Sequence, residues 1–175
     1  GKSGGKTADV IVIGGGPGGY VAAIKLAMLG KKTVLVEKDT VGGTYLNRGC
    51  IPTKALLHSA QVLSTIKNSA AAGITVDGYR VDTGAVNERK NGVVKKLTSG
   101  VAFLLKSRGV EVIAGTASFA VEKTLRVTDG KGNVQEISAE SIVIASGSES
   151  ARIPIDGIDG KNVITSTEAL DFTSL

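Results

Sequence analysis

Three glycines and one glutamate have the spacing that a dinucleotide-binding turn requires. Gly14, Gly16 and Gly19 follow the β-branched run 10–13, and Glu37 comes eighteen residues after Gly19. In such a turn the first glycine allows a tight reversal, the second lets the backbone approach a pyrophosphate, and the third lets the next helix pack closely on the strand. The N-terminus of that helix points free N–H groups at the phosphates, and the carboxylate accepts hydrogen bonds from an adenosine ribose. We therefore predict a dinucleotide site rather than a glycine-rich turn without a ligand.

The residues around this turn predict the order strand, turn, helix and strand. Four consecutive β-branched residues at 10–13 indicate a strand that is buried on both faces. Residues 21–29 have a helical composition, and Gly30 stands at a C-cap position. The next strand is predicted at 33–36, and it ends at Glu37.

Two long helices are predicted in the middle of the chain. A loop rich in glycine and turn residues covers 38–49, and the first helix runs from about residue 52 to 72. An irregular link over 73–82 leads to the second helix, which covers roughly 84–106 and stops at Gly109.

Short strands dominate the region that follows. Runs at 110–113, 117–121, 124–128 and 134–137, with a turn at 129–132, predict a small antiparallel meander. Residues 141–145 indicate one more buried strand, and the tail over 151–175 is predicted to be mostly irregular. The chain therefore has the pattern of an α/β, Rossmann-like domain, with a parallel sheet and an inserted antiparallel β-meander.

The charge of the chain does not indicate a nucleic-acid-binding protein. The formal net charge is +5, but the basic residues are scattered and aromatic residues make up only 3%. We place the pairs Arg89-Lys90 and Lys95-Lys96 on the solvated face of the second long helix. The apolar stripe that we expect to be buried on that helix consists of Val86, Val93, Leu97, Val101 and Leu104.

The remaining composition narrows the chemistry. One cysteine and one histidine exclude an internal disulfide framework and a zinc site of several cysteines or histidines. The apolar runs are too short to span a bilayer, so no membrane association is expected. A reducing compartment is predicted, namely the cytoplasm, or the mitochondrial matrix if the source is eukaryotic.

The stretch 42–54, Gly-Gly-Thr-Tyr-Leu-Asn-Arg-Gly-Cys-Ile-Pro-Thr-Lys, resembles the redox motif GGTCxNxGCIP[ST]K of the dihydrolipoamide dehydrogenase family of flavoprotein disulfide reductases. The glycine turn IGGGPGGY and the glutamate that ends the next strand belong to the same family pattern. The sequence ASGS at 145–148 is similar to the family's ATGS, so the resemblance covers essentially the whole chain from Asp9.

The resemblance implies FAD as the cofactor, with its pyrophosphate over the three glycines and its ribose on Glu37. It places Thr44 along the phosphate and ribityl portion, Lys54 near the flavin ring, and Cys50 against the flavin as a thiolate. A helix N-terminus and a nearby lysine favour that thiolate. The cofactor-binding residues that it implies are Gly14, Gly16, Pro17, Gly18, Gly19, Glu37, Lys38, Gly43, Thr44, Gly49, Cys50, Lys54, Gly115, Ala117, Ser146 and Gly147, with Gly115 and Ala117 near the adenine.

One position departs from the family motif. The second redox cysteine should stand five residues before Cys50, where this sequence has Tyr45. Without two thiols, exchange with a dithiol substrate cannot be completed, so the chain should not turn over lipoamide by the family route. Tyr45 as a natural loss, as an engineered change and as a sequence error all stay open. The alternative for Cys50 itself is a small buried hydrophobic residue. Cys50, Lys54 and the position of Tyr45 are thus the candidate catalytic positions.

Length is a second departure from the family. The family's NAD(H) fingerprint and its dimerisation domain follow this region, and we do not find them here. We expect the N-terminal FAD-binding part of a longer enzyme, with a flexible linker at 1–8, the FAD-binding domain at 9–150 and a connection toward an NAD-binding domain at 151–175. The intact enzyme is then expected to be a homodimer that acts on a small dithiol with NAD, in association with a 2-oxo acid dehydrogenase complex. The alternatives are an FAD-dependent quinone or dye reductase that has lost the disulfide, and a non-catalytic nucleotide-binding fragment.

Overall fold

A computed structural model of the protein describes residues 6–171. These residues form two compact units, one of residues 6–45 with 97–148 and the other of residues 46–96 with 149–171. The predicted linker at 1–8 needs a correction, because the first strand begins at Lys6 and therefore includes residues 6–8. The rest of that linker lies outside the described residues. The predicted domain boundaries at residues 9 and 151 stay a prediction.

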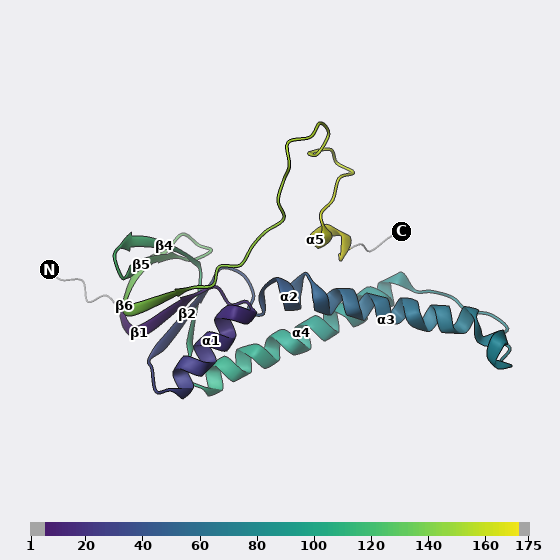
Figure 1. Cartoon of the computed structure of the whole chain (residues 1–175), viewed down its shortest axis with the longest axis horizontal. Coiled ribbons are helices and arrows are strands. Elements are labelled where there is room, and N and C mark those ends of the chain that lie inside the picture. Colours follow the sequence, from purple (N-terminus) through teal and green to yellow (C-terminus); the bar gives the residue numbers. More distant parts are fainter. Residues whose placement is uncertain (1–5, 172–175) are drawn as a thin grey trace. The chain divides into compact units, whose positions relative to one another are not determined.

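The first unit is built on one sheet of six strands, in the order β3-β2-β1-β6-β5-β4 (Figure 1). Its strands are β1 (Lys6–Ile13), β2 (Thr33–Glu37), β3 (Glu111–Ala114), β4 (Thr116–Val121), β5 (Thr124–Thr128) and β6 (Val134–Ile144). Pairing is parallel from β3 to β6 and antiparallel from β6 through β5 to β4. The predicted α/β fold with a parallel sheet and a β-meander is confirmed. The chain continues from β1 to β2 on one side of β1 and returns to β6 on its other side. Open α/β sheets bind ligands at the carboxyl ends of the strands where the order reverses in this way.

The last strand, β6, belongs to both parts of the sheet. Residues 134–138 pair with β5 in antiparallel fashion, and Ile137 to Ile144 pair with β1 in parallel fashion. The prediction of two separate strands at 134–137 and 141–145 is therefore wrong. The two halves differ in pattern, because 134–136 at the start are all exposed and 142–144 at the end form an apolar run. Because β6 pairs first with β5 and then with β1, the sequence of this one strand has the pattern of two.

The strand at 110–113 also has a different place from the one predicted. It does not begin the meander, because β3 pairs in parallel with β2 at the edge of the sheet, with Val34 opposite Glu111 and Glu37 opposite Ala114. Gly115 then separates β3 from β4 and donates its N–H to the Glu37 carbonyl at 2.8 Å. The meander itself consists of β4, β5 and the first half of β6.

The three predicted helices are present as α1 (Pro17–Met28), α3 (Cys50–Lys67) and α4 (Thr83–Ser107), and a 3-10 turn, η1, follows α3 at Ser69–Ala72. Two short helices were not predicted: α2 (Gly43–Asn47) lies in the predicted loop, and α5 (Ser166–Ala169) lies in the tail that was predicted to be mostly irregular. Gly30 has a φ of 80° just after α1, as its predicted capping position requires. The predicted helix from 52 to 72 is divided into α3 and η1.

The buried face of α4 matches the predicted stripe only in part, because Val101 is buried whereas Val86 and Val93 are half-buried. Leu97 and Leu104 are 40% and 47% exposed, whereas the buried positions are Asn87, Lys90, Thr98, Val101 and Leu105. This set also recurs at helical spacing, so periodicity alone did not distinguish between the two faces. Placing Lys90 on the solvated face is therefore wrong, because it is only 3% exposed.

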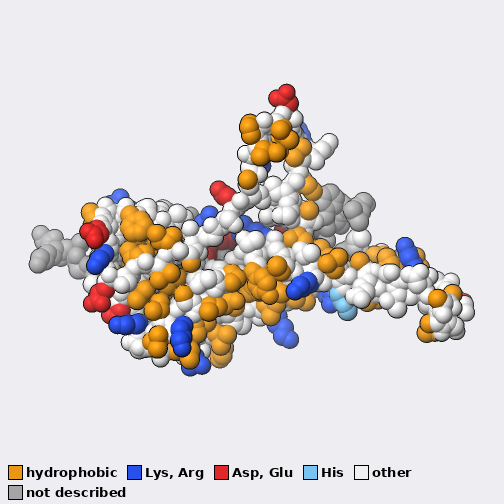
Figure 2. Space-filling model, in the orientation of Figure 1, with side chains coloured by type: hydrophobic (Ala, Val, Ile, Leu, Met, Phe, Trp, Pro, Cys, Tyr) orange, Lys and Arg blue, Asp and Glu red, His pale blue; other side chains and the backbone are white. Residues whose placement is uncertain are grey.

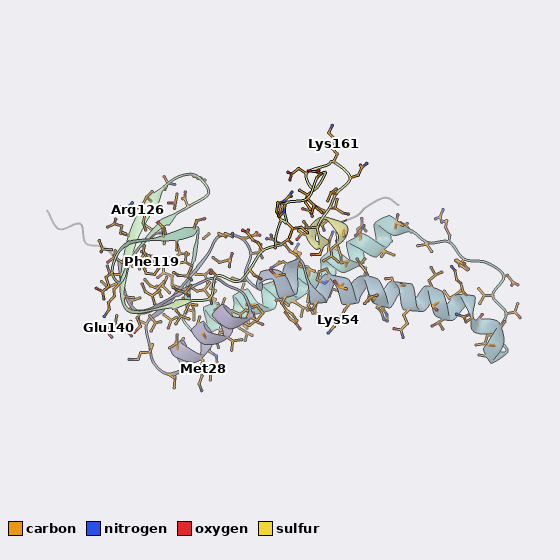
Figure 3. All side chains as sticks on the ribbon, turned by 45° about the horizontal axis from the view of Figure 1, so that its top comes forward. Met28, Lys54, Phe119, Arg126, Glu140 and Lys161 are labelled. Carbon is orange, nitrogen blue, oxygen red and sulfur yellow. The ribbon has the colours of Figure 1, made fainter. Side chains whose placement is uncertain are left out.

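The core of the sheet unit is almost entirely aliphatic. Ile11, Leu35, Leu125 and Ile137 are fully buried and come from four different strands. Large apolar side chains are also exposed, among them Val21, Met28, Leu29 and Phe103, and Figure 2 shows hydrophobic side chains on the viewed face of this unit. Met28 projects from the end of α1 in Figure 3. Within residues 6–171, no helix is both long and apolar enough to cross a membrane.

Candidate functional site

The turn after β1 joins three parallel strands at their carboxyl ends. Gly14 has a φ of 101°, and its N–H donates to the Val36 carbonyl on β2 at 2.8 Å. A Cβ atom on Gly14 would overlap the carbonyl of Ala145, which follows β6. Both the backbone conformation and the close approach exclude a larger residue at this position.

Two further close contacts fix the shape of the turn. A Cβ atom on Gly19 would overlap the carbonyl oxygen of Gly14, so the start of α1 packs directly on the end of β1. Gly43 has a φ of 57°, and a Cβ atom there would lie 2.6 Å from the Cα atom of Gly16. We call residues 14–19, together with Glu37 and Gly43, the glycine cradle.

The N-terminus of α1 is open. Gly16 is the N-cap and has no side chain to cap the helix, while Pro17 occupies the first turn, where an N–H would have no intrahelical acceptor. The first N–H groups of a helix are free to bind an anion, and the helix dipole adds positive potential. A Cβ atom on Gly18 would meet no atom within 4 Å. The start of α1 therefore has no capping side chain, and the Cβ position of Gly18 is open.

Glu37 connects the cradle to the end of β2. Its Oε2 accepts the N–H of Gly15 at 2.6 Å, and its Oε1 accepts the N–H of Asp39 at 2.8 Å. Each carboxylate oxygen can accept more than one hydrogen bond, so both can also accept a hydroxyl. Gly15 is a residue that our sequence analysis missed. A Cβ atom there would lie 3.1 Å from Oε2, so Gly15 lets the carboxylate approach the turn.

A cavity of about 200 Å³ lies beside the cradle. Its lining residues are Ile13, Gly14, Val36, Glu37, Lys38, Gly115, Thr116, Ala117 and Ser146. Drug-sized ligands occupy cavities of about 300–1,000 Å³, so this cavity is suited to only part of a dinucleotide. The structure thus brings together Gly14, Glu37, Lys38, Gly115, Ala117 and Ser146 from the predicted set. Thr116 and the apolar walls at Ile13 and Val36 were not predicted, because no motif marks them.

The Cys50 segment, residues 46–54, lies in the second unit. Cys50 is the first residue of α3 and is exposed, so the alternative of a buried hydrophobic residue is wrong. Lys54 lies four residues later on the same face of α3, and it is labelled in Figure 3. The first turn is held by the Thr53 hydroxyl, which donates to the Gly49 carbonyl at 2.7 Å. Cys50 and Lys54 are therefore neighbours that are open to solvent.

The other predicted positions have diverse surroundings. Tyr45 lies in α2 and is 40% exposed, and Thr44 beside it is exposed as well. Gly147 is exposed and has a φ of 74°. Among residues 6–171, no group of three or more His, Cys, Asp and Glu side chains could hold a metal ion.

The sequence matches the model of one protein family, described as pyridine nucleotide-disulphide oxidoreductase, over residues 8–174. The chain belongs to this family. Its curated relatives include dihydrolipoyl dehydrogenase from Pseudomonas aeruginosa, which is 46% identical over 170 residues that cover 95% of this chain and 36% of the relative. The mitochondrial dihydrolipoyl dehydrogenase of Schizosaccharomyces pombe is 46% identical over 171 residues, which cover 95% of this chain and 33% of the relative. The predicted resemblance is confirmed.

Solved structures agree with this assignment. The Cu(II) complex of the flavoprotein disulfide reductase RclA from Escherichia coli has a TM-score of 0.81 at 31% identity, over 97% of this chain and 35% of that chain. LpdA from Mycobacterium tuberculosis has a TM-score of 0.84 at 22% identity, over 97% of this chain and 38% of that chain, which supports the fold. This chain spans about a third to a half of the length of the curated relatives it matches.

Members of this pyridine nucleotide-disulphide oxidoreductase family are FAD-dependent flavoproteins. The glycine cradle has the backbone donors and the carboxylate acceptor that an adenosine diphosphate group requires, and the cavity beside it is large enough for part of that group. The Cys50 segment retains one cysteine, and the position five residues earlier holds Tyr45.

Proposed function

We propose that this chain binds FAD and that it is part of a dihydrolipoamide dehydrogenase-like oxidoreductase. The observation that carries the proposal is the glycine cradle, which combines a start of α1 that no side chain caps with a Glu37 carboxylate that lines the cavity beside Gly14. Backbone N–H groups suit a pyrophosphate, and a carboxylate that already accepts two N–H groups suits a ribose diol. The identity of 46% to dihydrolipoyl dehydrogenases supports the same conclusion.

Each part of the cofactor would have its own residues. Gly14, Gly16 and Gly19 would hold the pyrophosphate, with Pro17 and Gly18 at the same helix start. Glu37 would hold the ribose. Residues Lys38, Gly115, Ala117, Ser146 and Gly147 would surround the adenosine, and Gly43, Thr44, Gly49, Cys50 and Lys54 would serve the remainder. FAD, when bound, supplies an acceptor for two electrons.

The redox role proposed for Cys50 is limited by Tyr45. Oxidation of a dihydrolipoamide with reduction of NAD requires a second thiol, which would exchange with the substrate and form an internal disulfide with Cys50. Tyr45 has no thiol, so we propose that this chain does not perform the exchange. The NAD and dithiol substrates, the homodimer, the 2-oxo acid dehydrogenase complex and a location in the cytoplasm or mitochondrial matrix are proposals for the intact enzyme.

Tyr45 favours a second candidate function. A flavoprotein that passes electrons from a nicotinamide through FAD to a quinone or dye needs no disulfide. The exposed phenol at position 45 is compatible with that chemistry. The near-complete match of residues 42–54 to the disulfide-reductase motif argues against it, so it remains the alternative.

Calorimetric titration of the 175-residue chain tests the proposal. We expect FAD and ADP to bind, and we expect FMN, which lacks the adenosine diphosphate part, not to bind at the cradle. The matched variant is Gly19→Val. Its side chain would overlap the Gly14 carbonyl oxygen, so it should abolish binding of FAD and of ADP. If wild-type chain binds neither FAD nor ADP while its circular dichroism shows a folded protein, the proposed function is wrong.

A further inference from the structure

Lys90 is a buried lysine whose role lies outside the proposed flavin site. It comes from the N-terminal half of α4 and is only 3% exposed. Burying an ammonium group without partners costs several kcal/mol, so such a group must find acceptors. The acceptors of Lys90 therefore tell us which part of the chain its burial depends on.

The acceptors come from the end of the described chain, about 80 residues later in the sequence. The Lys90 ammonium donates to the backbone carbonyl of Leu170 and to the Asp171 carboxylate, and the second contact is 3.0 Å long. The two partners are buried to different degrees, because Asp171 is 77% exposed whereas Lys90 is almost fully buried. Segment 165–171 thus supplies two acceptors for the buried ammonium group.

The segment is prepared for this contact by its own hydrogen bonds. It contains α5, which starts with a capping box in which Thr165 N–H donates to the Glu168 carboxylate and Thr167 N–H donates to the Thr165 hydroxyl. The Thr165 hydroxyl also donates to Glu168 and holds the pKa of that carboxyl below its ordinary value. Leu170 is the C-cap, where helix carbonyls lack intrahelical donors and a cation is favourable.

We propose that Lys90 is the anchor that docks segment 165–171 onto α4. The contact satisfies two requirements at once, because a buried ammonium needs acceptors and the end of α5 needs a donor. The lysine donates hydrogen bonds to one backbone carbonyl and one carboxylate. The docking therefore depends in part on Asp171, the acidic residue that follows the C-cap. This inference goes beyond the proposed function and does not depend on flavin binding.

The neighbouring residue gives a useful contrast. Arg89 donates from Nη1 to the Ala55 carbonyl of α3 at 3.0 Å, so it holds a different element of the same unit. If Lys90 acted only through the general packing of α4, substitution of Arg89 and of Lys90 would loosen the same parts. An anchor predicts that each substitution loosens its own partner.

Hydrogen exchange of the 175-residue chain tests the anchor. In α5 and just after it, the N–H groups of Ala169, Leu170 and Asp171 donate to backbone carbonyls within the segment. We expect Lys90→Met to accelerate their exchange about tenfold, because hydrogen bonds to a charged group stabilise by about 1.5–3 kcal/mol. Arg89→Met should leave these three amides near the wild-type rate. Lys96→Met, on an exposed position of the same helix, is the matched control and should have no effect.

A second variant keeps the test independent of the folding of the first. Asp171→Lys changes an exposed side chain and places a second cation against Lys90, so it should also accelerate exchange of residues 169 and 170 about tenfold. Asp171→Asn should have a smaller effect, since the Leu170 carbonyl remains. Trypsin cleavage after the exposed Lys161, labelled in Figure 3, should rise in parallel.

The outcomes separate the anchor from a global effect and from the proposed function. Wild-type exchange at residues 169–171 in Lys90→Met, or at residues 169 and 170 in Asp171→Lys, overturns the proposal. If Lys90→Met also exposes the amides of β1, the chain has unfolded, and Asp171→Lys then decides alone. ADP binding, measured in the same samples, should be the same in Asp171→Lys as in the wild type. If the wild-type chain does not bind ADP, the proposed flavin site is contradicted, but the proposed anchor is not.

Discussion

The glycine cradle and the Cys50 segment are two different kinds of site. The cradle lies within one compact unit and is made of backbone atoms so close together that Gly14 and Gly19 cannot carry a side chain. The Cys50 segment lies in the other unit, and its proposed chemistry depends on exposed side chains. This backbone site tolerates no added atom at Gly14 or Gly19. A site made of side chains can keep its backbone and lack one functional group, as we propose for position 45, where this chain has tyrosine in place of a family cysteine.

The largest effect is expected from adding atoms to the cradle. Gly19→Val places a branched side chain where even a Cβ atom overlaps the Gly14 carbonyl. We expect a loss of about 3 kcal/mol in the free energy of unfolding and a loss of ADP affinity of at least about a hundredfold. Urea unfolding and calorimetry measure the two quantities.

Gly18→Ala is the control for this substitution. A Cβ atom on Gly18 meets no atom within 4 Å, and alanine is the better helix former by about 1 kcal/mol. Unchanged or slightly raised stability is therefore expected. Equal damage from both substitutions would show that the cradle is not distinguished by its backbone contacts.

A smaller effect is expected when the cradle loses a charge but keeps its shape. Glu37→Gln retains one acceptor oxygen near the Gly15 N–H but removes the negative charge that a ribose diol would contact. We expect ADP affinity to fall roughly tenfold. The affinity for 2′-deoxy-ADP should fall less, and calorimetry with both ligands measures the difference. A parallel loss for both nucleotides would mean that Glu37 supports the turn and does not contact the ribose.

The side-chain site should change its chemistry without a change in binding. Tyr45→Cys restores the family's spacing of two thiols, so mild oxidation should form an internal disulfide that protects both cysteines from alkylation. ADP affinity should stay within about twofold, because an exposed substitution rarely changes stability by more than about 0.5 kcal/mol. Mass spectrometry of the alkylated protein provides the measurement, and wild-type chain under the same oxidant is the control. Two freely alkylated thiols after oxidation would contradict the proposed redox centre.

The smallest effect on stability is expected at Asp129, whose carboxylate organises a turn outside the glycine cradle. The Asp129 carboxylate accepts the N–H groups of Lys131 and Asn133, much as Glu37 accepts two N–H groups. The Asn133 side chain, with these backbone N–H groups, holds the pKa of Asp129 below its ordinary value. A lowered pKa contributes stability above the unfolded-state pKa, and this stability is lost as pH falls through the folded-state pKa.

Asp129→Asn should therefore lower the urea midpoint slightly at neutral pH, and the difference from wild type should shrink in acid. Urea unfolding at a series of pH values measures this, and ADP affinity should not change. A difference that grows as pH falls would contradict the assigned direction.

The cradle was predictable because its constraint is local. A glycine that must adopt a positive φ, or that must lie under a neighbouring carbonyl, leaves its mark at fixed spacing in the sequence, as Gly14 and Gly19 do. Gly15 was missed because its close neighbour is a side chain from the next strand. The carboxylate of Glu37 approaches it only after β1 and β2 have paired.

Tertiary context decided the features that the sequence did not reveal. On α4, two helical faces both show a repeating pattern, and the neighbours of the helix select the one that carries Lys90 and Leu105. In β6, the change of partner from β5 to β1 produces a change of pattern within one strand. Such choices depend on residues far away in the sequence, which local spacing cannot represent.

The pairing of β6 with β1 determines how late in translation the central part of the sheet can form. Lys6 pairs with Ile137 and Ile13 with Ile144, so β1 waits for its second neighbour while the intervening chain is translated. At about 5–20 residues per second this delay lasts on the order of ten seconds. Ser146, which lines the cavity, emerges later still. A nascent chain should therefore acquire nucleotide affinity abruptly and late, and the cofactor cannot act as a template for the first half of the protein while it leaves the ribosome.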